Sequence, residues 1–254
     1  MPPVILKAED YTPYISMLLY SDPGVGKTVF ATSSESPTLV LATEEGTLSG
    51  VRQGAQFDIV ECFAPEGGWE AFEESIDWLY DGNAEKYNWV VVDTATSLQR
   101  RIMQHLSITR SNDPSAKNRN PDKYQLDEYG EQQVKFQKAV ERLIALPVNV
   151  LFTAHARMAE DQDGELYVKP DIHGKEAKAG ELAVWLSANV MATGFMSPIT
   201  YKKKVDGAEK IIQGRQIQWR GNEKVRAKDR FDVLGERTID KSLKHIEDLI
   251  FADD

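Results

Sequence analysis

The residues best suited to chemistry form a glycine-rich loop at 24–28, which reads G-V-G-K-T. An apolar run at 15–20 precedes this loop, and a helix is predicted to open at Thr28. In such a strand–loop–helix order, glycines let backbone N–H groups surround phosphate oxygens. Lys27 would reach the terminal phosphates and the Thr28 hydroxyl would bind Mg²⁺, whereas Ser21 replaces the first glycine of the usual pattern and changes only how the chain enters the loop. The predicted phosphate-binding residues are Asp22, Pro23, Gly24, Val25, Gly26, Lys27, Thr28 and Val29.

Two acidic positions follow apolar strands and complete a candidate hydrolytic site. Asp93 ends a buried run, where a carboxylate needs a cation or hydrogen bonds, so we predict that Asp93 holds Mg²⁺. An aspartate that caps the next helix is the alternative. Because Thr94 rather than a glutamate follows, Glu44 and Glu45 are the candidate bases that activate water. A solvated acidic loop is the alternative for this pair.

These motifs resemble the RecA-like ATPases, and in particular the phage-type AAA/RecA-like nucleotide-binding proteins, a group that includes truncated RecA-like single-strand annealing proteins. The phosphate loop is specific by itself, and the order of all the segments carries the resemblance. It implies a RecA-like P-loop NTPase core that uses ATP and Mg²⁺, with its base where Glu44 and Glu45 lie. The segments are D-P-G-V-G-K-T (22–28), L-V-L-A-T-E-E-G (39–46), V-V-V-D-T (90–94), L-F-T-A-H-A-R (151–157) and A-K-D-R (227–230).

The resemblance also implies roles for three polar residues further along the chain. His155 ends a predicted core strand, at the place where RecA-like proteins carry a residue that senses the γ-phosphate. Lys228 and Arg230 resemble the K-x-R motif by which a RecA-like subunit reaches its neighbour's ATP, which implies a homo-oligomeric ring or filament. A packed histidine and two solvated charges are the alternatives that the residues themselves leave open.

Basic residues in two predicted loops are candidates for binding single-stranded DNA. By the resemblance, 107–124 and 157–175 would be the DNA-binding loops, because cations follow a phosphate backbone and an aromatic ring can stack on a base. The basic block at 199–230 is a third candidate, and ordinary solvated surface is the alternative for all three. The predicted DNA-binding residues are Arg110, Lys117, Arg119, Lys123, Tyr124, Arg157, Lys169 and Lys175.

Alternating apolar runs and amphipathic stretches predict an α/β fold. We expect a mainly parallel sheet with helices on both faces and a C-terminal antiparallel hairpin extension, all in a single domain over 1–254. Residues 1–14 would form an N-terminal segment, and 199–254 the hairpin and terminal helix. The predicted strands are 15–20, 38–42, 57–62, 89–92, 148–154 and 190–195, with helices near 28–32, 69–80, 98–108, 131–146, 176–188 and 238–251 and a hairpin at 199–219 that turns at 206–207.

Composition narrows the class of protein further. The chain has 254 residues, 41% of them apolar, and a net charge of −10, which argues against a simple nucleic-acid binder. The charge is uneven, since 1–100 carries 5 Lys/Arg against 16 Asp/Glu, whereas 199–230 carries 10 against 4. Cys62 is the single cysteine, and no apolar run is long enough to span a membrane. We expect a cytoplasmic protein, located in the host cytoplasm if a phage encodes it.

The leading prediction is an ATP-binding RecA-like ATPase that binds single-stranded DNA and promotes phage-type recombination or strand annealing as an oligomer. A single-strand-binding protein is a possible further partner. A nucleotide-gated assembly protein with negligible turnover and a small-molecule P-loop kinase are the alternatives.

Overall fold

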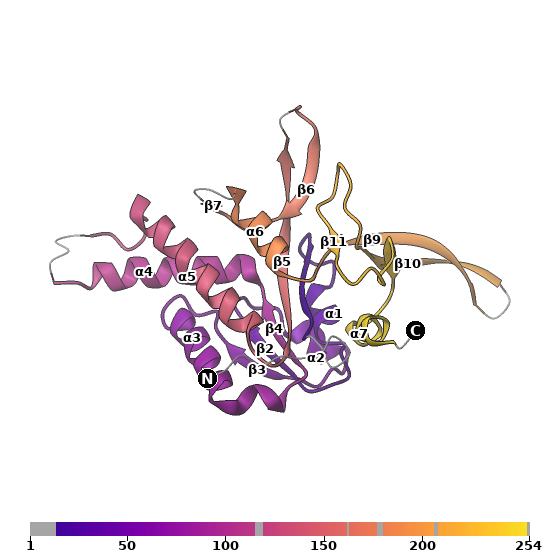
Figure 1. Cartoon of the computed structure of the whole chain (residues 1–254), viewed down its shortest axis with the longest axis horizontal. Helices are drawn as coiled ribbons and strands as arrows, with labels where there is room; N and C mark the ends of the chain where they lie inside the picture. The colour runs from indigo at the N-terminus through magenta and orange to yellow at the C-terminus, as the bar shows by residue number, and fades with distance from the viewer. Residues whose placement is uncertain (1–13, 115–118, 162, 177–179, 206–207, 253–254) are drawn as a thin grey trace, which may run out of the picture.

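The computed structural model describes residues 14–114, 119–161, 163–176, 180–205 and 208–252, and its elements are labelled in Figure 1. In chain order they are β1 (Ser16–Ser21), α1 (Lys27–Ala31), β2 (Thr38–Ala42), α2 (Leu48–Arg52), β3 (Asp58–Glu61), α3 (Gly68–Trp78), a π-helical turn η2 (Leu79–Asn83), a 3₁₀ turn η3 (Ala84–Lys86), β4 (Trp89–Asp93), α4 (Ala95–Ser111), α5 (Leu126–Ile144), β5 (Asn149–Glu160), β6 (Leu166–Pro170), β7 (Lys175–Glu176), β8 (Gly180–Glu181), α6 (Leu182–Asn189), β9 (Ala192–Val205), β10 (Ala208–Gln218), β11 (Lys228–Asp229), β12 (Arg237–Ile239) and α7 (Leu243–Phe251).

One mixed sheet organises the described residues. Its strand order is β12-β10-β9-β1-β5-β4-β2-β3, with β6 paired to β5 and β11 to β9 beside this path. From β3 across to β9 the neighbouring strands are parallel, whereas β10 and β12 add antiparallel pairs. The predicted α/β class, with a mainly parallel sheet and an antiparallel C-terminal extension, is confirmed. The extent of the single domain over 1–254 stays a prediction.

Three strands in the middle of the sheet are buried along their whole length. Every residue of β1, β2 and β4 is buried, as continuous apolar runs in a parallel sheet predict. In the register, Ser21 lies beside His155 and Ala42 lies beside Asp93. The carboxyl ends of these strands are therefore level, and the polar residues that follow them share one edge of the sheet.

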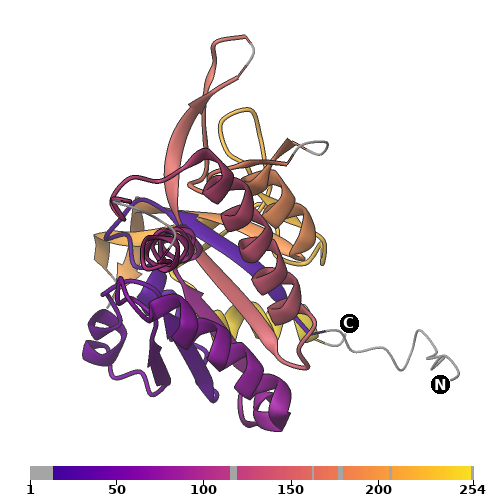
Figure 2. The same ribbon diagram turned by 90° about the vertical axis from the view of Figure 1, so that its left-hand side faces the viewer.

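Helices cover both faces of the sheet. On one face, apolar side chains of α3, α4, α5 and α6, such as Phe72, Ile102 and Phe136, form the larger buried cluster. On the other face, α1 and α7 contribute residues such as Phe30 and Ile246 to a second cluster. Figure 2 shows α5 and α7 on opposite sides of the strands. Burial on both sides is the physical reason why the strands carry no alternating polar residues.

Three predicted helices begin five or more residues away from the expected position. Helix α5 begins at Leu126 because Gln125 and Glu128 form a capping box, in which the Glu128 carboxylate accepts from the Gln125 backbone N–H at 2.6 Å. The helix expected over 176–188 is wrong in its first turn, since β7 and β8 precede α6. The terminal helix also begins later, because β12 pairs with β10 and Ser242 then caps α7.

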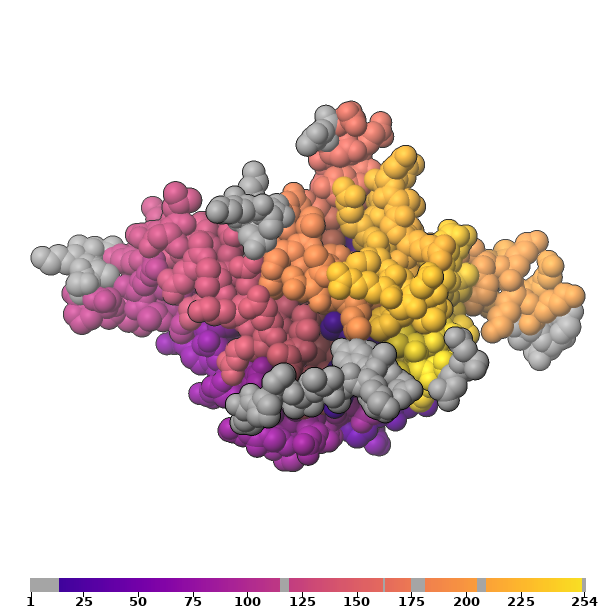
Figure 3. Space-filling model, viewed as in Figure 1, coloured from indigo at the N-terminus to yellow at the C-terminus, as the bar shows by residue number. Residues whose placement is uncertain are grey.

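Two β-hairpins project from the body. Strand β5 runs on beyond the sheet to pair with β6, and β9 pairs with β10 over eleven residue pairs from Phe195↔Gln218 to Val205↔Ala208. Figure 3 shows the β5–β6 hairpin at the top and the β9–β10 hairpin at the right. The second confirms the predicted hairpin, while its predicted turn at 206–207 lies outside the described residues.

Candidate functional site

Four strand ends bring the predicted catalytic residues together. The phosphate loop follows β1, Glu44 follows β2, Asp93 ends β4, and His155 lies in β5 beside the last residue of β1. Thr43 ties two of these ends together, because its hydroxyl donates to the Thr94 carbonyl at 2.7 Å and accepts from the Thr94 N–H at 2.8 Å. Residues that are distant in the sequence thus meet at one edge.

The phosphate loop contains two glycines in the left-handed region. Gly24 has φ 80° and Gly26 has φ 109°, conformations that residues with side chains rarely adopt. The Lys27 ammonium is buried and donates to the Ser21 carbonyl at 3.2 Å, the Ser21 hydroxyl at 3.2 Å and the Asp22 carbonyl at 3.3 Å. Burial lowers the pKa of Lys27, although the carboxylates of Asp93, Glu44 and Asp22 oppose that shift. The lysine is held inside the loop, with negative charge around it.

Thr28 and Asp93 form the candidate metal site. The Thr28 hydroxyl donates to Asp93 Oδ2 at 2.7 Å, and the Thr153 hydroxyl donates to Asp93 Oδ1. Asp93 is only 3% exposed, and burial raises its pKa despite these two hydrogen bonds and the nearby Lys27 ammonium. A bound cation would relieve the cost of keeping this carboxylate ionised in the interior.

Glu44 and Glu45 lie in different surroundings. Glu44 Oε2 accepts from Ser97 Oγ at 2.5 Å, His155 Nε2 at 3.0 Å and Thr94 Oγ1 at 3.2 Å. Burial would raise the pKa of Glu44, but the hydrogen bonds from His155, Ser97 and Thr94 outweigh it and lower the pKa to about 2. Glu45 is exposed. The structure therefore separates two adjacent acids that the sequence leaves equivalent.

His155 is anchored through its backbone as well as its ring. Its N–H donates to the Thr96 hydroxyl at 3.0 Å, and its carbonyl accepts from the Asp171 N–H at 2.8 Å. Because Nε2 bonds to an ionised carboxylate, the proton is assigned to Nε2. The buried Nδ1 has no hydrogen-bond partner among the described residues. The ring is therefore held through Nε2 and the backbone, while its other nitrogen is enclosed by the protein.

These side chains fit ATP and Mg²⁺. Mg²⁺ commonly takes only one or two protein oxygens and completes its shell with water and substrate phosphates, as the Thr28–Asp93 pair would allow. At Gly24 no atom lies within 4 Å of the position where a Cβ would project, so the loop backbone is open there, whereas at Gly26 the Arg215 guanidinium occupies that position. Within the described part of the chain, no group of three or more His, Cys, Asp or Glu side chains lies close enough together to hold a metal ion.

Lys228 and Arg230 contact their own chain. The Lys228 ammonium donates to the carbonyls of Ser187 and, at 2.6 Å, Val190, while Arg230 Nη2 donates to the Ala188 carbonyl at 2.9 Å. These carbonyls lie at the C-terminus of α6, where cations are favourable. Burial, followed by the neighbouring Arg230 charge, lowers the pKa of Lys228 to about 8. A capping function within the chain thus accounts for both residues, and their action on a neighbouring subunit stays a prediction.

Several predicted DNA-binding cations have partners within the protein. Arg110 pairs with Asp127 and Glu131 of α5, Arg119 pairs with the fully buried Glu128, and Lys169 pairs with Glu181. The prediction of a loop over 107–124 is wrong at its start, because α4 runs on to Ser111. The segment 157–175, predicted as a second DNA-binding loop, is largely occupied by β5 and β6 as a paired hairpin, and its role in DNA binding stays a prediction.

The remaining predicted DNA-binding residues are divided. Lys123 and Tyr124 are exposed, and Arg157 Nη1 lies 3.2 Å from His173 Nδ1. Lys117 and the side chain of Lys175 lie outside the described residues. These loops therefore supply fewer free cations than the sequence suggests.

Some residues of the site had no signal in the sequence. Ser97 and Thr153 bond to Glu44 and Asp93, and serine and threonine at such places are indistinguishable in sequence from ordinary polar residues. Arg215 of β10 also reaches the phosphate loop, with Nη1 3.3 Å from the Gly26 carbonyl oxygen. The uneven charge along the chain singled out the basic block that contains Arg215 as a candidate for DNA binding, not as part of the phosphate site.

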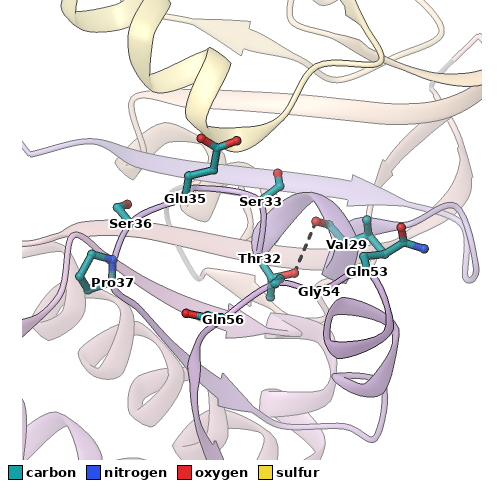
Figure 4. A pocket seen from close by; sticks show the side chains of 10 residues that line it. Val29, Thr32, Ser33, Glu35, Ser36, Pro37, Gln53, Gly54 and Gln56 are labelled. Carbon is teal, nitrogen blue, oxygen red and sulfur yellow. Dashed lines mark hydrogen bonds between the residues drawn. The ribbon is translucent and has the colours of Figure 1, made fainter.

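A cavity of about 640 Å³ lies beside α1, away from these side chains (Figure 4). Its lining includes Val29, Thr32, Glu35 and Gln53 but no lysine or arginine. Lys27, Asp93 and Glu44 do not line it. Size alone therefore does not mark the site, because this cavity lacks the cations that phosphate requires.

The fold and the site together define a P-loop NTPase domain of the AAA type. The family model described as "AAA domain" matches residues 14–231, and the chain belongs to this family. No curated protein matches the sequence.

Among solved structures, the chain is similar to the assembled ATPase EscN, in complex with its central stalk EscO, from the type III secretion system of enteropathogenic E. coli. The identity is 12% and the TM-score 0.44, over 72% of this chain and 42% of that chain. This chain thus spans less than half the length of that neighbour. In the described residues, no helix is long and apolar enough to cross a membrane.

Proposed function

We propose that this chain is a Mg²⁺-dependent ATPase. The observation that carries the proposal is the meeting of Lys27, the Thr28–Asp93 pair and the Glu44–His155 pair at one edge of the sheet. A phosphate cradle, a metal position and an ionised acid beside it are the parts that phosphoryl transfer to water requires. The AAA-type domain supports this assignment.

In this mechanism each side chain has a separate task. The loop amides and Lys27 bind the phosphate chain, and Thr28 and Asp93 hold Mg²⁺, which neutralises charge on the phosphates when bound. His155 donates to the γ-phosphate, a role that the RecA-like resemblance implies. Such a bond would compete with its bond to Glu44, so that phosphate binding would change the hydrogen bonding of the acid.

Glu44 is better suited to orienting water than to deprotonating it early. A carboxylate with a pKa near 2 is a weak base at neutral pH but a good hydrogen-bond acceptor. Phosphoryl transfer has a loose transition state and needs little proton transfer before the water oxygen bonds to phosphorus. The low pKa of Glu44 is therefore compatible with hydrolysis.

The test is nucleotide binding by Lys27→Ala, measured by calorimetry with ATP and Mg²⁺. We expect a loss of affinity of roughly 10- to 100-fold, because one charge-assisted contact is removed. Lys138→Ala, on the exposed side of α5, is the matched control. Equal affinity of Lys27→Ala and wild type would overturn the assignment of the loop.

Two further functions would use the same loop, and phosphate release distinguishes them. A nucleotide-gated assembly protein would bind ATP without releasing phosphate and would change its oligomeric state with nucleotide. A small-molecule kinase would transfer phosphate to an acceptor in place of water. The Glu44–His155 pair favours the ATPase, because it supplies beside the loop an ionised acid that can orient water.

We further propose that the chain forms a homo-oligomer that binds single-stranded DNA and acts in recombination. The RecA-like resemblance supports it, together with the exposed Lys202, Lys203 and Lys204 on the β9–β10 hairpin. Electron microscopy with single-stranded DNA, with and without a non-hydrolysable ATP analogue, is the test. Rings or filaments that need both would support it, and monomers without bound DNA would exclude it.

A further inference from the structure

Arg215 packs against the phosphate loop from a distant part of the sequence. It belongs to β10, and its Nη1 lies 3.3 Å from the carbonyl oxygen of Gly26. A Cβ atom on Gly26 would collide with the same nitrogen. Glycine at position 26 is thus needed twice, for its φ of 109° and for the room that the guanidinium occupies.

The backbone of Arg215 is fixed on both sides by Asp240. The Arg215 N–H donates to Asp240 Oδ1 at 2.7 Å, and the Asp240 N–H donates to the Arg215 carbonyl at 2.8 Å. Tyr201 Oη donates to Asp240 Oδ2 at 2.6 Å and so orients the carboxylate. Gly214 allows this approach, because a side chain there would collide with Asp240. The base of the arginine is therefore positioned before any ligand binds.

The Arg215 guanidinium makes one hydrogen bond among the described residues. The Gly26 carbonyl that it contacts already accepts from the Phe30 N–H at 3.0 Å. In the parts of the chain that the structure describes, Arg215 makes no other side-chain hydrogen bond and no ion pair within 4 Å, although its charge lies close enough to Asp240 to help lower the pKa of that carboxyl. Because a guanidinium carries five N–H donors, most of them stay available to an anion.

The position of Arg215 beside the loop suits a phosphate chain. Arg215 lines a cavity of about 250 Å³ together with Val29 and Ser33 of the loop–helix segment. The larger cavity of Figure 4 borders the same helix but presents the acid Glu35 and no cation. On the side of Arg215, a polyanion that leaves the loop along α1 would meet Arg215 and Lys241, while the Asp240 carboxylate in the same lining is held by hydrogen bonds from Tyr201 and the Arg215 N–H.

We propose that Arg215 is a second phosphate-binding cation of the nucleotide site, supplied by the same chain that supplies Lys27. It donates hydrogen bonds to the phosphate chain from β10, whereas Lys27 does so from the loop itself. This inference rests on the proposed function, because it takes ATP as the ligand. It also ties nucleotide binding to the β9–β10 hairpin, which carries the arginine.

The test is calorimetric titration of wild type, Arg215→Ala and Arg215→Gln with Mg²⁺-ATP and with ADP. We expect both variants to bind either nucleotide roughly 10- to 100-fold more weakly, with a smaller dependence on salt, because one charged contact is lost. Arg215→Gln keeps most of the side-chain stem, so it reports on the charge if the alanine variant does not fold. Arg220→Ala is the matched control, since Arg220 is exposed just after β10 and pairs with Asp232.

The outcomes separate this inference from the proposed function. If wild type binds ATP and folded Arg215→Gln binds it within twofold of wild type, the inference is overturned and the function stands. If wild type itself binds no ATP, both are overturned. Mixing Arg215→Ala with Lys27→Ala should not restore tight binding, because both cations act in one chain; recovery of tight sites on mixing would overturn the same-chain assignment.

Discussion

Glu44 Oε2 and His155 Nε2 lie 3.0 Å apart, although 111 positions separate the two residues in the sequence. One follows β2 and the other lies in β5, with β4 between the two strands. The pair therefore depends on the strand order of the sheet. It also separates Glu44 from the exposed Glu45, and the first prediction follows from this difference.

Glu44→Gln should lower ATP turnover by about 100-fold or more and leave ATP affinity almost unchanged, because the amide keeps the shape but not the charge that orients water. Steady-state phosphate release and calorimetry measure the two quantities. Glu45→Gln is the control and should hydrolyse ATP at close to the wild-type rate. If Glu45→Gln lost turnover and Glu44→Gln kept it, the two roles would be reversed.

The low pKa of Glu44 predicts a pH dependence of stability. Folding lowers this pKa from 4.5 to about 2, so the ionised acid stabilises the folded chain fully above pH 4.5. That contribution disappears as the pH falls from 4.5 towards 2, where the folded chain also takes up the proton. Urea unfolding of wild type and Glu44→Gln should show a gap of about 2 kcal/mol at pH 7 that closes over this range. A gap that is independent of pH would contradict the shift.

Asp93→Asn should leave the stability of the ligand-free protein intact but weaken the binding of Mg²⁺-ATP. Burial raises the pKa of Asp93, so its ionised form weakens the fold, and an amide can still bond to Thr28 and Thr153. We expect the variant to melt at or above the wild-type temperature without ligand, but to gain much less from Mg²⁺-ATP. Thermal melts with and without Mg²⁺-ATP test this. If Mg²⁺-ATP raised the melting temperature of Asp93→Asn as much as that of wild type, Asp93 would not be a metal ligand.

Arg119→Ala should act on the fold rather than on DNA directly. Its partner Glu128 is fully buried and also caps α5, so the variant leaves an uncompensated charge in the interior. We expect a loss of about 3–5 kcal/mol in the free energy of unfolding. Lys123→Ala, at an exposed position nearby, should leave stability unchanged. If Arg119→Ala had normal stability but failed to bind single-stranded DNA, Arg119 would be a DNA-binding residue after all.

The sequence predicted the sheet better than it predicted the surface. Continuous apolar runs identified strands such as β2 and β4 almost to the residue, since burial on both faces leaves a simple pattern. Helix starts were less accurate, because Gln125 and Ser242 act through capping bonds that periodicity does not reveal. The residues after the strands converge as expected, because parallel strands end at one edge.

Surface cations could not be assigned from the sequence in the same way. Arg110 and Arg119 belong to a basic segment, yet their partners lie on α5, which only the folded chain brings near. Arg215 reaches the loop through the sheet register and through its contact with Asp240. Ion pairs and close approaches of this kind depend on tertiary placement, which spacing along the chain does not encode.

The β9–β10 hairpin also has a mechanical consequence. Beyond the pair Arg215↔Pro198, the ladder continues without a break to Val205↔Ala208. At about 3.3 Å per residue, this part is roughly 23 Å long, and near its base Tyr201 Oη bonds to Asp240 Oδ2. Because Arg215 sits at its base, a small rotation there is multiplied along a stiff arm into a displacement of several ångströms at the tip. A change at the phosphate loop would therefore be transmitted through Arg215 to the tip of the hairpin.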